Sequence, residues 1–293
     1  MTKKIDTGDA PRFVRARDLA AEGWTPKRLA RAVAAGRFLR LRKGVYAEPG
    51  LPEVCAAAVQ AGGRLCGSSE LQRRGVFILK NTATHVHIGP TSSRLRPVPE
   101  GTAVQRGVLL RTPHPRSCSV EAFDAVVQSV RAQPWHEGVA TIDSAVHLGV
   151  LAIGDLDDLF AALPRRCRRA RRLIDTRSES GPETIVRLIA RELGAVVEVQ
   201  VPIDGVGRVD LVLDGWLIVE CDSEQFHSDW KQRREDLRRD QAAAALGYAT
   251  YRPVAEDIMW HRDDVKAALA GLLARGRSAV VHRGGTLSRA AGW

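Results

Sequence analysis

Residues 13–50 begin with apolar positions at helical spacing and end with short strand-like runs. Arg17–Ala21 predicts a short helix. Thr25-Pro26 supplies an N-cap followed by a proline at the first helical position, so a second helix is expected to begin there. Its apolar residues recur on one helical face up to Gly36, which ends it. The segment therefore predicts two consecutive helices joined by a tight turn.

Two short apolar runs, Phe38–Leu41 and Val45-Tyr46, follow around the turn Arg42-Lys43-Gly44. Two helices and a basic hairpin in this order predict a winged helix, in which a helix fits the major groove and cations neutralise phosphates. A winged helix can also serve as a protein-docking module whose basic side chains are only solvated. The residues predicted to contact DNA are Lys27, Arg28 and Arg31 on the second helix and Arg40, Arg42 and Lys43 on the wing.

Residues 51–165 mix predicted helices with one strand and carry no recognisable catalytic pattern. The helices are expected at 54–61, 68–74, 121–130 and 141–150, and the strand at 85–88. His85 and His87 would share a strand face, but without a third ligand nearby we expect two surface histidines. The densest positive run follows, from Arg165 to Arg172, and either a solvated surface or phosphate binding is compatible with it.

The C-terminal part predicts the order helix, three strands, helix, strand, helix. The Asp214-Gly215 pair lies between two apolar runs, which is a strong hairpin signal. A Ser/Glu-rich stretch at 176–181 is expected as a linker, and residues 276–293, rich in Gly, Arg and Ser, as a flexible tail. The elements are a helix at 182–194, strands at 197–203, 209–213 and 216–221, a helix at 231–246, a strand at 248–252 and a helix at 264–273.

Three carboxylates, Asp210, Glu220 and Asp222, interrupt the apolar runs of this hairpin. Burying an ionised carboxylate costs several kcal/mol unless a cation or hydrogen-bond donors compensate it. A two-residue turn would place Asp210 opposite Val219 and direct Glu220 to the other face. A bulged three-residue loop would place Asp210 opposite Ile218 and gather all three on one face. We predict the bulged register and a site for one divalent metal ion formed by these three carboxylates.

Composition narrows the class of protein. The chain has 293 residues, enough for two or three domains, and a net charge of +10. This excess of positive charge favours a polyanionic partner, most often nucleic acid. A basic surface that is only solvated would have the same net charge. Five scattered cysteines without a Cys-x-x-Cys pair fit a reducing cytoplasm. No stretch approaches the roughly 20 apolar residues of a membrane span, so no membrane partner is expected.

The N-terminal segment resembles a known regulator family. Leu29 and the run Gly36-Arg-Phe-Leu-Arg-Leu-Arg-Lys-Gly-Val-Tyr46 resemble the N-terminal domain of AbiEi-type antitoxins from abortive-infection toxin–antitoxin systems. The order of elements that follows is similar to the middle part of such proteins. The resemblance implies DNA binding and a cognate toxin or antitoxin protein as a further partner.

Residues 178–257 resemble PD-(D/E)XK nucleases, and more narrowly a family related to the very-short-patch-repair endonuclease. Two positions depart from the pattern: the superfamily has lysine where Asp222 stands, and the narrower family often has glycine where Ser223 stands. The matching residues are Glu183, Arg208-Val-Asp210, Val219-Glu-Cys-Asp222, His227, Arg233-x-x-Asp236-x-x-Arg239-Asp240, Gly247-Tyr248 and Arg252.

The nuclease resemblance implies a restriction-endonuclease-like αβββαβ domain that hydrolyses DNA phosphodiesters with Mg²⁺ or Mn²⁺. Glu183 would complete or orient the metal shell, and His227 would act as general base or leaving-group acid. Arg239 would stabilise the charge of the phosphate in the transition state. The nucleic-acid contacts expected from this part of the chain are Lys231, Arg234 and Arg238.

We therefore expect an α/β (α+β) chain with a winged helix at 1–50, an AbiEi-like middle domain at 51–175, a nuclease-like domain at 176–275 and a tail at 276–293. The main functional hypothesis is a metal-dependent DNA endonuclease targeted by the winged helix, acting in phage defence, toxin–antitoxin function or DNA repair. The alternative is a non-catalytic DNA-binding antitoxin or transcriptional regulator with a degenerate nuclease fold.

Overall fold

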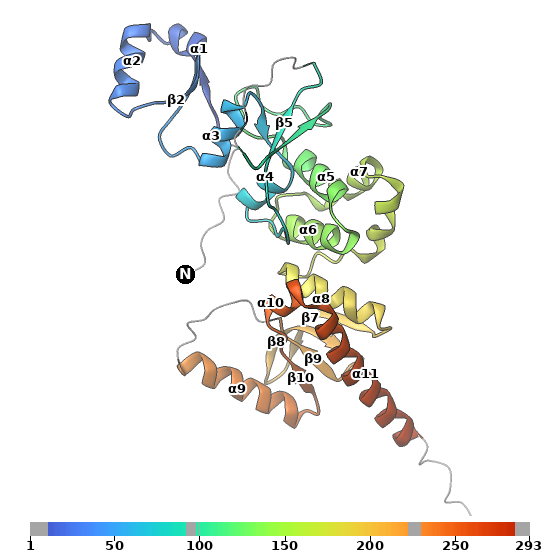
Figure 1. Ribbon diagram of the computed structural model, residues 1–293. Helices are drawn as coiled ribbons and strands as arrows, with labels where there is room; N and C mark the ends of the chain where they lie inside the picture. Colours follow the sequence, from blue (N-terminus) through green and yellow to red (C-terminus); the bar gives the residue numbers. More distant parts are fainter. Residues whose placement is uncertain (1–10, 92–97, 99, 222–229, 285–293) are drawn as a thin grey trace, which may run out of the picture. The chain divides into compact units, whose positions relative to one another are not determined.

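The computed structural model describes residues 11–91, 98, 100–221 and 230–284, without the side chains of 231–233 and 277–284 (Figure 1). The chain divides into two compact units, residues 1–174 and residues 175–293. All helices and strands below belong to one unit or the other. Among the residues described, none of the helices combines the length and the apolar character that crossing a bilayer requires.

The first unit begins with the predicted helix–turn–helix and hairpin. Its elements are β1 (Val14–Arg15), α1 (Ala16–Ala21), α2 (Pro26–Ala34), β2 (Leu39–Arg42) and β3 (Val45–Ala47). The three strands form an antiparallel sheet in the order β1-β3-β2. Strand β1 was not predicted, because two residues are too few to show a period.

The sheet of this segment shares its core with the helix that follows, α3 (Glu53–Gln60). Phe13, Leu41 and Val45 belong to one buried cluster with Cys55 and Ala58 of α3. The packing is therefore continuous across residue 50, where the sequence suggested a domain boundary. The small sheet is therefore packed on α3, while the buried residues Leu19 of α1 and Leu29 and Ala32 of α2 lie outside that cluster.

The rest of the first unit contains a second small sheet and a group of helices. Strands β4 (Arg64–Leu65), β5 (Thr84–Ile88) and β6 (Thr102–Arg106) pair in that order, β4 antiparallel and β6 parallel to β5. The helices are α4 (Gly67–Arg73), α5 (Ala122–Ala132), α6 (Trp135–His147), η1 (Ile153–Asp155), α7 (Leu156–Ala162) and η2 (Arg165–Leu173).

Helix α6 differs from the expected 141–150. It begins at Trp135, directly after Pro134, and ends before Gly149, whose φ of 67° is unfavourable for other residues. Its first turns carry the small and apolar residues Gly138 and Val139, both buried. Tertiary packing therefore extends a helix that the apolar period alone placed six residues later.

The second unit follows the predicted order with one additional short helix. Its elements are α8 (Gly181–Glu192), β7 (Val197–Ile203), β8 (Gly207–Leu213), β9 (Leu217–Val219), α9 (Trp230–Ala245), β10 (Ala249–Tyr251), α10 (Ala255–Trp260) and α11 (Arg262–Gly284). The sheet has the order β10-β9-β8-β7, with β10 parallel to β9 and the other pairs antiparallel. Helix α9 makes the crossover that a parallel pair requires.

The β8–β9 hairpin has neither of the two registers considered from sequence. Leu213 pairs with Leu217 and Val212 with Ile218, so the loop is Asp214–Trp216. Asp214 and Gly215 both have positive φ, 49° and 73°. The register is shifted by two residues from the bulged one that we predicted. Because side chains alternate with a period of two, Asp210 and Glu220 still lie on the same face.

Helix α11 continues to Gly284, through the first part of the segment expected as a tail. A Cβ placed on Gly276 would lie 2.3 Å from a ring carbon of Trp216, so the indole ring rests directly on the helix backbone. This contact ties the β8–β9 turn to α11. Residues 285–293, the remainder of the expected tail, lie outside the described residues.

Candidate functional site

Helix α2 presents one basic and one apolar side. The Thr25 hydroxyl accepts a hydrogen bond from the Arg28 backbone N–H at 3.2 Å, as an N-cap residue does. Leu29 and Ala32 are buried against the rest of the unit. Lys27, Arg28 and Arg31 are exposed, as predicted for a helix that contacts nucleic acid.

An aromatic pair stabilises the start of α2 and was not predicted. The rings of Trp24 and Phe38 meet edge to face at 5.3 Å, and the Arg28 guanidinium lies 4.3 Å from the centre of the Trp24 ring. The sequence signal at this position, an apolar residue just before the N-cap, indicates packing of Trp24 against Leu29, the fourth helical residue, and does not indicate the contact with Phe38. Arg28 is thereby held at the N-terminal end of α2.

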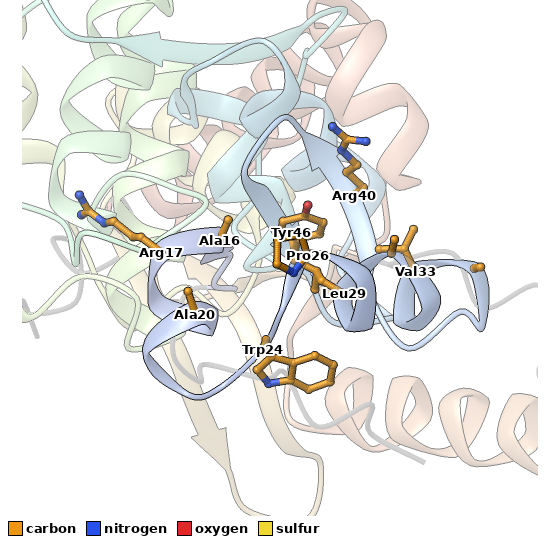
Figure 2. Close-up of a pocket in the computed structure, with 11 residues that line it drawn as sticks. Ala16, Arg17, Ala20, Trp24, Pro26, Leu29, Val33, Arg40 and Tyr46 are labelled. Carbon is orange, nitrogen blue, oxygen red and sulfur yellow. The ribbon is translucent and has the colours of Figure 1, made fainter.

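The apolar side of α2 opens onto a cavity of about 700 Å³ between α1, α2 and the sheet (Figure 2). Trp24, Leu29, Val33 and Tyr46 line it, and Arg40 stands at its edge. The basic side of α2 and this apolar cavity are therefore adjacent features of the same small motif.

The wing residues have different environments. Arg40 and Lys43 are exposed, as a phosphate-contacting hairpin requires. Arg42 is only partly exposed, and its Nη1 lies 3.3 Å from where a Cβ of residue Gly62 would be. Arg42 thus packs toward the turn after α3, and the exposed charge of the wing comes from its two neighbours.

A cluster of polar side chains lies on one face of the second unit's sheet. Asp210 on β8 accepts a hydrogen bond from the Cys221 backbone N–H at 2.8 Å. Glu183 on α8 accepts one from the Glu179 backbone N–H at 2.9 Å. The amide of Gln200 donates to both carboxylates, at 2.9 Å to Glu183 and 3.4 Å to Asp210. Burial raises the pKa of Glu183, and the nearby charge of Asp210 raises it further.

Gln200 has a φ of 54°, a left-handed conformation in the middle of strand β7. The β7–β8 ladder pairs Val199 with Leu211 and Val201 with Val209, which leaves Gln200 opposite Asp210 but outside the regular pairing. Such a conformation costs of the order of 1–3 kcal/mol and persists only where the surroundings impose it. The distorted strand directs the Gln200 amide between the two carboxylates.

Glu220 is neutralised by two arginines. Arg239 of α9 donates to one carboxylate oxygen at 2.8 Å, and Arg252, directly after β10, forms an ion pair with the other. Arg252 also pairs with Asp240 at 2.8 Å. Burial raises the pKa of Glu220, and the two guanidinium groups oppose that rise. The network joins β9, α9 and the end of β10.

Arg239 also donates to the backbone carbonyls of Val206 at 3.0 Å and Arg208 at 2.9 Å. Three acceptors, the Glu220 carboxylate and these two carbonyls, therefore hold the Arg239 guanidinium in place. The nuclease resemblance implies that the same group would contact a phosphate. Arg234 and Arg238, on the same helix, are exposed and remain available to a polyanion. Nothing is described of the side chain of Lys231.

Glu220, one of the predicted metal ligands, is paired with arginines in the described part of the chain. Both carboxylate oxygens of Glu220 face arginines, and the part of the chain that the structure describes contains no group of three or more His, Cys, Asp or Glu side chains arranged to hold a metal ion. Two predicted site residues, Asp222 and His227, lie outside the described residues. Within the described part, the cluster is a hydrogen-bonded carboxylate pair beside an ion-pair network.

A family model matches the N-terminal part of the chain. Residues 9–49 match the family model described as the transcriptional regulator AbiEi antitoxin. No curated protein matches the chain. The match confirms the N-terminal resemblance inferred from sequence and covers α1, α2 and the β2–β3 hairpin. The nuclease resemblance of residues 178–257 stays a prediction.

Proposed function

We propose that this protein is a DNA-binding transcriptional regulator of the antitoxin type, which binds DNA through α2 and the β2–β3 wing and acts together with a cognate toxin. The observation that carries the proposal is the exposed basic row of α2, held by an N-cap and an aromatic pair, within the segment that matches AbiEi antitoxin regulators. The exposed cations supply the phosphate contacts on which affinity for DNA depends.

The ion-pair partners of Glu220 favour a regulator over an endonuclease. A metal-binding carboxylate needs free oxygens, whereas Glu220 has Arg239 and Arg252 on its two oxygens. The second unit would then serve as a folded platform for nucleic acid or for the toxin. The exposed Arg234 and Arg238 on α9 are its candidate contacts with nucleic acid.

Reversing two charges on α2 tests DNA binding. We expect Arg28→Glu/Arg31→Glu to weaken binding to a labelled duplex from the region upstream of the protein's own gene by roughly 100-fold. Fluorescence anisotropy across a salt series measures both the affinity and its salt dependence, and the salt slope should become flatter.

The matched control is Lys80→Glu/Arg275→Glu, which removes the same charge at exposed positions outside the winged helix. It should weaken binding only slightly. Equal loss in both variants would show a general charge effect, and unchanged binding in the α2 variant would locate the DNA surface elsewhere.

Metal-dependent hydrolysis of DNA is the second candidate function. The observation in its favour is the placement of Asp210 and Glu220 on one sheet face, with Glu183 linked to Asp210 through Gln200. Mg²⁺ or Mn²⁺ could reach Glu220 only by displacing Arg239 and Arg252. We expect no nicking of supercoiled plasmid with Mn²⁺ by the wild-type protein. Nicking that Asp210→Ala abolishes would instead establish the endonuclease.

A further inference from the structure

The arginine-rich segment at the end of the first unit forms an unusually long 3₁₀ helix. Helix η2 spans Arg165–Leu173, nine residues, whereas runs beyond three or four are uncommon because 3₁₀ hydrogen-bond geometry is poor. Its sequence repeats with a period of three: Arg-Arg-Cys, Arg-Arg-Ala, Arg-Arg-Leu. A 3₁₀ helix has three residues per turn, so each position of the repeat forms a straight row. Departures from local rules of this kind concentrate at functional sites.

The three rows have separate environments. Cys167 and Ala170 are buried at 9% and 5% exposure, and Leu173 is half-buried, so this row faces the protein. The other two rows consist entirely of exposed arginines. One row is Arg165, Arg168 and Arg171, and the other is Arg166, Arg169 and Arg172.

The arginines of each row are close and mostly uncompensated. With a rise of about 2.0 Å per residue, neighbouring positions in a row are about 6 Å apart. Arg171 forms an ion pair with Asp157, and Arg166 donates to the Arg131 carbonyl at 2.8 Å. The other four, Arg165, Arg168, Arg169 and Arg172, have no carboxylate partner among the described residues. Like charges at this spacing repel one another, and a bound polyanion would relieve that repulsion.

We propose that η2 is a second nucleic-acid site, which binds the phosphate backbone independently of sequence. Each strand of B-DNA carries one phosphate per 3.4 Å of helix axis, so a row of η2 that lies parallel to that axis has about one arginine for every two phosphates of a strand. Arginine binds phosphate oxygens bidentately, and contacts to phosphates carry no sequence information. The proposal rests on the proposed function as a DNA-binding regulator and adds a contact outside the matched segment.

The geometry favours nucleic acid over two other anionic partners. A membrane-binding helix needs an exposed apolar face to insert, and the outward rows of η2 contain only arginine. An acidic protein could also be attracted, but it offers no regular repeat of charge to match rows of evenly spaced guanidinium groups. The experiment must therefore distinguish binding of an acidic polypeptide from binding of DNA.

Two double variants of the full chain carry the same charge change on the same helix. Arg168→Gln/Arg169→Gln removes uncompensated arginines, and Arg166→Gln/Arg171→Gln removes arginines that already have protein partners. The probe is a fluorescein-labelled duplex of scrambled sequence, titrated at roughly 50 to 200 mM salt. For Arg168→Gln/Arg169→Gln we expect the plot of log K against log salt to become less steep, its negative slope decreasing in magnitude by about 2, since each phosphate contact contributes about 0.9.

The control variant Arg166→Gln/Arg171→Gln should change that slope by less than half as much. Arg168→Gln/Arg169→Gln should also keep or raise the melting temperature, because it removes repulsion. An unchanged slope in this variant, with binding still sensitive to Arg28→Glu/Arg31→Glu, would overturn the η2 site and leave the proposed function intact. If Arg168→Gln/Arg169→Gln lost binding to poly-L-glutamate but kept its binding to DNA, the nucleic-acid site on η2 would be overturned in favour of a site for an acidic protein.

Discussion

Replacing Glu220 with alanine is expected to destabilise the second unit by about 2–4 kcal/mol in buffer containing EDTA. Removal of one partner of a buried ion pair leaves the other charge buried and unpaired, which costs 3–5 kcal/mol when the pair is fully buried. Here the side chains of Arg239 and Arg252 are 35% and 23% exposed and keep other acceptors, so the loss should be smaller.

The sign of this effect separates the two candidate functions. In a metal site without its metal, neighbouring carboxylates repel one another, and removing one of them raises stability. In an ion-pair network, removing the shared carboxylate lowers stability. Chemical denaturation of the wild type and Glu220→Ala measures the difference, and an increase in stability for Glu220→Ala would contradict the ion-pair interpretation.

Two further variants sharpen that measurement. Asp204→Ala removes an exposed carboxylate from the same unit and should change stability by less than about 0.5 kcal/mol. The double variant Glu220→Ala/Arg252→Ala should lose less than the sum of the single variants, with a coupling energy of about 1–3 kcal/mol. Additive losses would mean that Glu220 and Arg252 do not stabilise each other.

Replacing Glu70 with alanine is expected to destabilise the first unit by about 3–5 kcal/mol. The Glu70 side chain is fully buried, at 0% exposure, and accepts 2.7 Å hydrogen bonds from Arg73 and Arg74. Both arginines are themselves largely buried, at 14% and 13% exposure. Without Glu70, two guanidinium groups would lose their carboxylate in a region that water reaches poorly.

Calorimetry of the full chain measures the loss of stability in Glu70→Ala. Faster hydrogen exchange in the peptide that contains α4 would assign this loss to the first unit. Glu70→Gln keeps one acceptor oxygen and should lose less than Glu70→Ala. The control Asp157→Ala removes a carboxylate that is 79% exposed and paired with Arg171, and should cost no more than about 1 kcal/mol. Equal losses for Glu70→Ala and Asp157→Ala would contradict a dominant contribution from burial.

Much of the fold could be predicted because local rules are strong where helices and turns begin and end. The Thr25-Pro26 start of α2 and the turn at Asp214-Gly215 depend on neighbouring residues alone, and the structure has both. The prediction that Asp210 and Glu220 share one face is also correct, although the predicted register is wrong. The observed register differs by two residues, and a shift of two residues leaves each side chain on the same face of the sheet. The period of three in η2 is visible in the sequence, but only the structure shows that it coincides with the three-residue turn of a 3₁₀ helix.

The candidate sites were less predictable, because their chemistry depends on partners distant in sequence. The sequence identified Asp210 and Glu220 as carboxylates out of place in apolar strands, and it determined the basic charge of α2 and the wing. Only the tertiary structure decided that arginines from α9 and the end of β10 form ion pairs with Glu220 and that a left-handed Gln200 joins Glu183 to Asp210. The physical reason is that burying a charge requires compensation without specifying which long-range neighbour provides it.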